Sequence, residues 1–136
     1  MKWANSLIRI ANHEVETLQK RLGEIANRRL VMEMRMASLH AEAEAEQQRA
    51  NVDAEAGWYH VGFQRGWHLR RDLLKAQIDE TLVEEAGARD ALARAFEELK
   101  KFEHVAEVAK IAAAKEQDRR ETAAMDEMGL RKASGR

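Results

Sequence analysis

Three observations predict an all-α fold, a long antiparallel two-helix coiled-coil hairpin in a single domain. The 136-residue chain has no proline, which a helix interior excludes by steric clash and by its missing N–H. Charged residues make up 35% of the chain and apolar residues 45%, a balance typical of coiled coils rather than of ordinary globular domains. Apolar residues also recur at alternating steps of three and four along two stretches of similar length.

The first predicted helix covers about residues 6–56. Its 3.5-residue repeat keeps one stripe of side chains against a partner helix, and Asn5 or Ser6 is a suitable N-cap. Arg29 interrupts the stripe, and we expect it either to set register or partner choice, or to lay its stem along the interface and reach solvent. The seam ends in small or polar residues, so looser pairing is expected there. The seam positions are Ile8, Ala11, Val15, Leu18, Leu22, Ile25, Arg29, Met32, Met36, Leu39, Ala43, Glu46, Ala50 and Asp53.

The chain reversal is predicted at a tip of about residues 57–68. Gly57, Gly62 and Gly66 fall in this stretch, and each glycine costs a helix about 1 kcal/mol relative to alanine. A GxxxG spacing of this kind also occurs in membrane helix dimers, but here Gln64 and Arg65 lie between the glycines, so a turn is the better interpretation.

The second helix is predicted from about residue 69 to 128, with Gly129 as its stop and a frayed tail over 129–136. Its register is less strict than that of the first helix, and four positions are left with two candidates each. The stripe is Leu74, Ile78, Thr81 or Leu82, Ala88, Leu92, Ala95 or Phe96, Leu99, Phe102, Val105 or Ala106, Ala109, and Ala112 or Ala113.

The competing architecture is one continuous helix that forms a parallel dimer. The glycine segment lies near the middle of the chain and the two stretches match in length, which favours a monomeric hairpin. Such a rod encloses no pocket, so we expect no enzyme activity, no catalytic residues and no cofactor.

Composition and motifs give little sign of site chemistry. With 23 basic and 24 acidic residues, the net charge of −1 favours neither nucleic acid nor an acidic membrane. There is no cysteine and no apolar run long enough to span a membrane, so a cytoplasmic protein without membrane insertion is expected. His13 and Glu14 begin a zinc-protease pattern, but Thr17 replaces its second histidine, and His60 and His68 lack a third ligand. No metal site is predicted.

The tip concentrates aromatic side chains in a chain otherwise poor in them, and it carries a local charge of +3. Either the rings pack on one another and close the hairpin, or exposed rings with nearby arginines form a protein-binding surface. Stacking with nucleic acid uses the same residue types, but the rest of the chain offers no basic stripe. The aromatic residues are Trp58, Tyr59, Phe63 and Trp67, with Arg65, Arg70, Arg71 and Lys75 against Asp72 nearby.

Taken together, the size, the two heptad arms and the aromatic, glycine-containing middle resemble the FliJ family. This is the small coiled-coil protein of the flagellar export apparatus, related to the stalk proteins of type III secretion. The charged ending of the second arm is similar as well: Phe102–Glu107 (FEHVAE), Lys115–Glu121 (KEQDRRE) and Met125–Met128 (MDEM).

The resemblance implies a stalk-like hairpin whose paired ends enter a hexameric export ATPase. It also implies contacts with the cytoplasmic domain of the membrane export gate and with substrate chaperones, at the inner face of the cell membrane at the flagellar base. Trp58, Tyr59, Phe63 and Trp67 would then contact the gate, together with the less well matched Gln47, Asn51 and Ala54. The ATPase contacts would be Arg9, Lys20, Arg21, Arg119 and Arg120.

Two other functions are kept open. The first is a self-associating coiled-coil scaffold or adaptor without an export role, and the second is nucleic-acid binding through the tip. Flagellar and virulence-type secretion are not distinguished by the residues.

Overall fold

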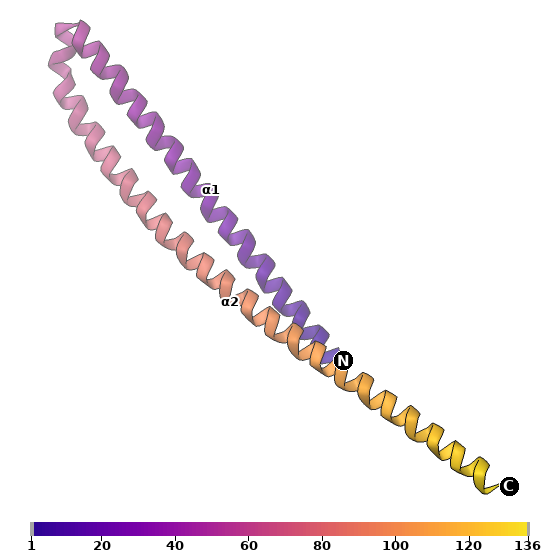
Figure 1. The fold of residues 1–136 in the computed structure, drawn as a ribbon. Coiled ribbons are helices and arrows are strands. Elements are labelled where there is room, and N and C mark those ends of the chain that lie inside the picture. Colours follow the sequence, from indigo (N-terminus) through magenta and orange to yellow (C-terminus); the bar gives the residue numbers. More distant parts are fainter. Residues whose placement is uncertain (1, 136) are drawn as a thin grey trace. The chain divides into compact units, whose positions relative to one another are not determined.

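Two long helices make up the computed structural model, which describes residues 2–135 except for the side chains of Ala54 and Ala56. Helix α1 is Lys2–Val52 and helix α2 is Ala54–Ser134 (Figure 1). No strand occurs among the described residues. The predicted all-α helical hairpin is confirmed.

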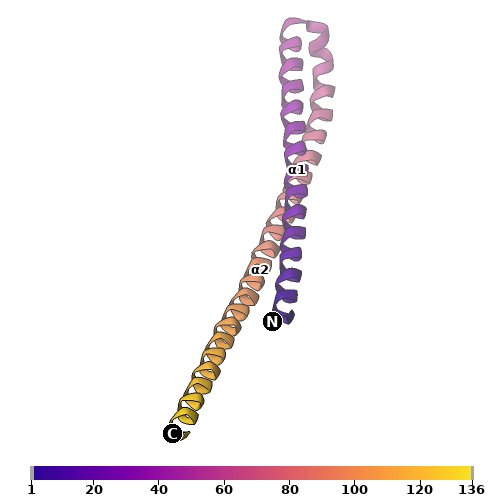
Figure 2. The same ribbon diagram turned by 90° about the vertical axis from the view of Figure 1, so that its right-hand side faces the viewer.

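The chain divides into two compact units. The bend unit is Thr17–Leu92, and the terminal unit combines Met1–Glu16 with Ala93–Arg136. In the bend unit the two helices run antiparallel (Figures 1 and 2). Accordingly, Gln47 of α1 is hydrogen-bonded to His60 near the start of α2, whereas Arg28, earlier in α1, forms an ion pair with Glu84, later in α2.

The seam of α1 follows the predicted 3.5-residue stripe closely. Every predicted position from Ile8 to Ala50 is buried or half-buried, and Ile25 is only 1% exposed. On α2 in the bend unit the choice between two candidates is settled, since Thr81 is 3% exposed and Leu82 is 45% exposed. Thr81 satisfies its hydroxyl by donating to the carbonyl oxygen of Gln77 at 2.8 Å, so a polar residue is tolerated at a buried position.

In the terminal unit, small side chains fill most of the interface. Ala4, Ala11 and Val15 of α1 are buried, as is Leu99 of α2. At two of the three ambiguous positions in this unit the smaller residue faces inward: Ala95 and Ala106 are half-buried, whereas Phe96 and Val105 are exposed. Ala112 and Ala113 are both exposed, and so is every described residue from 117 to 135. The last part of α2 therefore has no partner helix within this unit.

The reversal lies at Asp53, not in the glycine segment. Asp53 is the one residue between the helices; its N–H still donates to the carbonyl of Arg49 at 3.1 Å, and its own carbonyl accepts from Gly57 at 3.0 Å. Its carboxylate accepts the backbone N–H of Glu55 at 3.0 Å, which is the geometry of an N-cap for α2. Asp53 is therefore an exposed cap of α2 and does not occupy the seam as predicted. Residues 57–68, where the reversal was predicted, are helical.

The helix ends also differ from the sequence prediction. Helix α1 already includes Lys2, and the Ser6 hydroxyl donates back to the carbonyl of Lys2 at 2.9 Å instead of capping the helix. Helix α2 continues through Gly129 to Ser134, because one glycine costs only about 1 kcal/mol. An ion pair between Arg131 and Glu127 at 3.0 Å, one turn apart, supports this last stretch.

Candidate functional site

The four aromatic residues near the bend do not form one surface. Trp67 is only 8% exposed and lies in the seam, where its indole N–H donates to the carbonyl oxygen of Leu39 at 2.6 Å. Its ring has edge contacts with His40 at 5.3 Å and His68 at 5.2 Å, and the guanidinium of Arg71 lies 5.4 Å from the ring centroid. Trp67 is therefore a packing residue that joins the two helices.

Phe63 is half-buried and stacks on His60, with ring centroids 6.2 Å apart. The Nε2 atom of His60 is hydrogen-bonded to the side-chain oxygen of Gln47 at 2.9 Å. Phe63, Trp67 and the small Ala43 line one groove of about 110 Å³. Large rings of α2 thus face the small residues at the end of the α1 seam, which explains how that stretch still packs.

Of the four aromatic residues near the bend, Trp58 and Tyr59 are the freely accessible ones, 82% and 68% exposed. Leu69 and Leu73, which the sequence analysis did not select, are also exposed at 72% and 64%. Leu69 comes about three helical turns after Trp58, and Leu73 comes about one turn after Leu69. The three side chains therefore share one face of α2, and this face points away from the seam. The signal was present in the sequence as apolar residues between the seam positions. We call Trp58, Tyr59, Leu69 and Leu73 the bend surface.

Ion pairs neutralise part of the positive charge around the bend surface. Arg70 pairs with Glu42 of α1 at 3.3 Å, and Arg71 pairs with Asp72 at 3.0 Å. Arg65 and Lys75 form no ion pair among residues 2–135. The bend surface therefore combines exposed apolar side chains with two available cations, which suits a partner with apolar and acidic groups.

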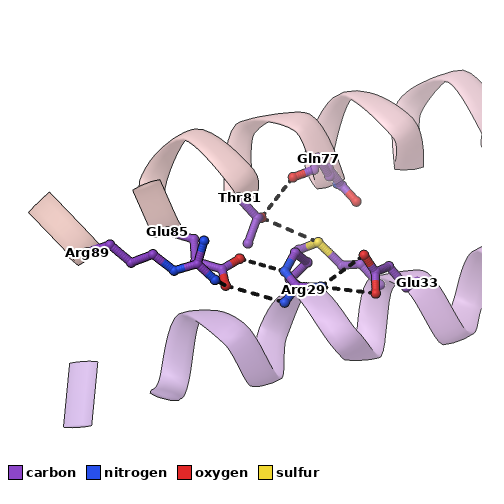
Figure 3. Close-up of polar contacts among 7 residues, drawn as sticks. Arg29, Glu33, Gln77, Thr81, Glu85 and Arg89 are labelled. Carbon is purple, nitrogen blue, oxygen red and sulfur yellow. Dashed lines mark hydrogen bonds and ion pairs between the residues drawn. The ribbon is translucent and has the colours of Figure 1, made fainter. Parts of the chain in front are cut away.

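Farther from the bend, the seam contains a layer of charged residues. Arg29 of α1 binds the carboxylate of Glu85 of α2 through Nε at 2.5 Å and Nη2 at 3.3 Å (Figure 3). Glu33 accepts from Arg29, and Arg89 donates to Glu85 at 2.9 Å. The Glu85 side chain is 3% exposed and that of Arg29 is 25% exposed. The predicted seam position of Arg29 is confirmed, and it binds a buried carboxylate that the sequence analysis did not place in the α2 stripe.

A second ion pair lies beside this layer. Arg28 binds Glu84 at 2.9 Å, with about half of the arginine side chain and 38% of the glutamate side chain exposed. The hydrogen bond from Arg29 holds the pKa of Glu85 below its ordinary value of 4.5, against the opposing effect of burial. In the same way, Arg28 lowers the pKa of Glu84. Both carboxylates are therefore ionised at neutral pH.

The residues assigned to ATPase contact fall into both units. Arg9, Arg119 and Arg120 are exposed in the terminal unit, where Arg119 and Arg120 both pair with Glu116 at 2.8 and 3.2 Å. Lys20 and Arg21 are exposed in the bend unit and line a groove of about 450 Å³.

The remaining gate-assigned residues are polar or undescribed. Gln47 donates a hydrogen bond to the side chain of Asn51 at 3.1 Å, in addition to its contact with His60. The side chain of Ala54 lies outside the described part of the chain.

Neither a metal cluster nor a membrane helix is found in the described part of the chain. No three or more His, Cys, Asp or Glu side chains gather there as potential ligands of one ion. Neither helix contains a stretch apolar and long enough to cross a bilayer.

Comparison with known proteins places these features in a family. Over 133 residues the chain is 59% identical to the "Flagellar FliJ protein" of Caulobacter vibrioides, in strain NA1000 / CB15N and in strain ATCC 19089 / CIP 103742 / CB 15. The alignment covers 98% of this chain and 96% of each relative. No family model and no solved structure matches. The identity and coverage show that this chain belongs to the FliJ family of flagellar proteins.

Proposed function

We propose that this protein is a non-enzymatic, stalk-like part of the flagellar protein export apparatus. It couples a hexameric export ATPase to the cytoplasmic domain of the export gate and assists the delivery of substrates and their chaperones. The observation that carries the proposal is the 59% identity to proteins named "Flagellar FliJ protein" over nearly the whole chain. The same name favours a flagellar role over virulence-type secretion.

The bend surface supports the assignment of the gate contact. Large exposed apolar side chains are what protein-binding hot spots use, and Trp58, Tyr59, Leu69 and Leu73 are all more than half exposed. Trp67 is buried and holds the helices together, so we assign it no direct gate contact. Phe63 is half-buried and is the weaker candidate for this contact.

The terminal unit supports the assignment of the ATPase contact. There, α2 presents a helix that is exposed on all sides from residue 117 to 134, and this segment contains Arg119 and Arg120. An exposed helix can enter a groove or central hole without first unpacking from another helix. Arg9 lies in the α1 part of this unit, and Lys20 and Arg21 remain weaker candidates in the bend unit.

Mechanically, such a protein acts by binding rather than by catalysis. An asymmetric helical element that contacts the subunits of a symmetric hexamer unequally shifts the populations of their conformations. Binding to these two partners would place the protein at the inner face of the cell membrane, at the flagellar base. Fluorescence imaging of the tagged protein in cells with and without the gate tests this location.

The gate contact is tested by measuring binding of the purified gate domain by calorimetry. The Trp58→Ala/Leu69→Ala variant is expected to bind at least tenfold more weakly, because two central apolar contacts are lost. Val83→Ala is the matched control, since Val83 is 74% exposed on the same helix but lies farther from the bend. Equal binding by both variants would refute the bend surface as the gate site.

The ATPase contact is tested by the rate of ATP hydrolysis of the export ATPase. Addition of the chain should stimulate hydrolysis, and Arg119→Ala/Arg120→Ala should reduce the stimulation while gate binding persists. A chain that forms stable dimers and changes neither the ATPase nor the gate would instead favour the self-associating scaffold. A salt-sensitive shift with single-stranded nucleic acid would favour binding through the tip.

A further inference from the structure

The charged layer at Arg29 and Glu85 stands out because it occupies the seam itself. Its neighbours along α1 are Ile25, which is 1% exposed, and the half-buried Met32. Along α2 its neighbours are the buried Thr81 and Ala88. An ionised pair therefore lies where the heptad pattern elsewhere places mainly apolar or small side chains.

Stability alone does not account for a buried pair of this kind. Removing two charges from water is unfavourable, and apolar replacement of a buried ion pair is often neutral or stabilising. The same chain makes the comparison internally: Arg28 and Glu84 have the same sequence separation, 56 residues, but lie on the exposed rim. The rim pair avoids most of the desolvation, whereas the seam pair does not.

The seam pair has a different effect on alternative pairings. If α1 paired in parallel and in register with α1 of a second copy, Arg29 would face the same residue of that copy. If α2 paired in this way, two Glu85 side chains would meet. A shift of one heptad within the antiparallel hairpin would place Arg29 at the level of Ile78 or Leu92. Arg29 and Glu85 would then lose each other as partners across the seam and keep only their ion pairs within the same helix, with Glu33 and Arg89. Each alternative therefore carries a penalty that the native pairing avoids.

We propose that the Arg29–Glu85 layer is a pairing-selectivity element that directs α1 onto α2 of the same chain in one register and disfavours parallel pairing with a second copy. The native hairpin neutralises both charges, and Glu33 and Arg89 complete the hydrogen bonding of the layer. This property is independent of the export role. It keeps a chain with long heptad arms from forming the parallel dimers that such arms otherwise favour.

The first experiment replaces the layer with apolar residues and measures molar mass by size-exclusion chromatography with light scattering. Wild type is expected to be monomeric across a wide range of concentration. Arg29→Leu/Glu85→Leu should remain helical and unfold at the same or a higher urea concentration, yet populate dimers as concentration rises. The matched control Arg28→Leu/Glu84→Leu should stay monomeric. A strictly monomeric seam variant, or dimers in the control alone, overturns the proposal.

The second experiment uses charge reversal and native mass spectrometry. Arg29→Glu places two carboxylates in the layer and Glu85→Arg places two guanidinium groups there, so each single variant should unfold at lower urea concentration than wild type. When the Arg29→Glu and Glu85→Arg variants are mixed, an acidic side chain of one variant can pair with a basic side chain of the other at each of these seam positions. A heterodimer should therefore form. The double reversal Arg29→Glu/Glu85→Arg should return to a monomer. A mixture that contains no heterodimer, or a double reversal no more stable than the single variants, overturns the proposal.

Discussion

Replacing Trp67 with alanine should lower the free energy of unfolding by about 3 kcal/mol. A buried tryptophan covers about 150–250 Å², which at ~25 cal/mol per Å² corresponds to about 4–6 kcal/mol. That figure is an upper bound, because the unfolded chain already covers part of the ring and alanine keeps its β-carbon. With the ring 8% exposed, the expected loss lies near the lower end of the range measured for tryptophan truncation, about 3–5 kcal/mol.

Trp67→Phe separates the hydrogen bond from the packing. Phenylalanine keeps most of the apolar contact but cannot donate to the carbonyl of Leu39, which Trp67 reaches at 2.6 Å. That carbonyl lies within α1 and keeps its helical partner, so no buried acceptor is left unsatisfied. The expected loss is about 1–2 kcal/mol, of which ~1 kcal/mol is the net value of one hydrogen bond.

Urea unfolding followed by far-UV circular dichroism measures both losses. Trp58→Ala is the control, because Trp58 is 82% exposed and its truncation should change stability by less than about 0.5 kcal/mol. If Trp67→Ala and Trp58→Ala unfold at the same urea concentration, Trp67 does not join the helices in solution and the division between packing and contact residues is wrong.

Three further predictions use the same unfolding measurement. Asp53→Ala should cost about 1 kcal/mol by removing the cap of α2, whereas Asp53→Asn should be nearly neutral; equal losses would contradict the cap. Gly62→Ala and Gly66→Ala should each stabilise by about 0.5–1 kcal/mol, because both glycines are helical and open space surrounds the added β-carbon; a loss would reveal a contact there. Folding lowers the pKa of Glu85 below its ordinary value of 4.5, so the ionised carboxylate stabilises the fold above that pH and this stabilisation is lost as the pH falls through the folded pKa. Glu85→Gln should therefore weaken the dependence of the free energy of unfolding on acid pH. An unchanged dependence would exclude the Arg29–Glu85 pair as its source.

The sequence predicted the seam of α1 well because periodicity reports burial directly. Leu22, Ile25 and Leu39 recur at heptad spacing, and even Arg29 was assigned to the stripe by its spacing alone. The α2 stripe was harder to follow because Glu85 fills the position between Thr81 and Ala88. A glutamate is normally read as a surface residue, so only the missing step in the spacing indicated that it belonged to the seam.

The reversal was misplaced because glycine weakens a helix without necessarily ending it. Gly62 and Gly66 together cost about 2 kcal/mol, which packing of the long helix against α1 can offset. Asp53 marks the reversal by a different mechanism, since its side chain accepts the backbone N–H of Glu55, which the first turn of α2 leaves without a helical partner. The burial of Trp67 likewise depends on this earlier reversal, which brings it level with Leu39.

The single-residue connection at Asp53 also constrains how a chain of this kind can change in length. With no slack loop, inserting one residue into either arm of the bend unit rotates the side chains between the insertion and the bend by about 100° and turns the seam toward solvent. Whole heptads added in matched pairs, one to each arm, preserve both the face and the alignment of Arg29 with Glu85. The turn and the charged layer therefore fix the alignment of the two arms at two points. Homologous hairpins are expected to differ in arm length by multiples of seven residues, with the same number added to or removed from each arm.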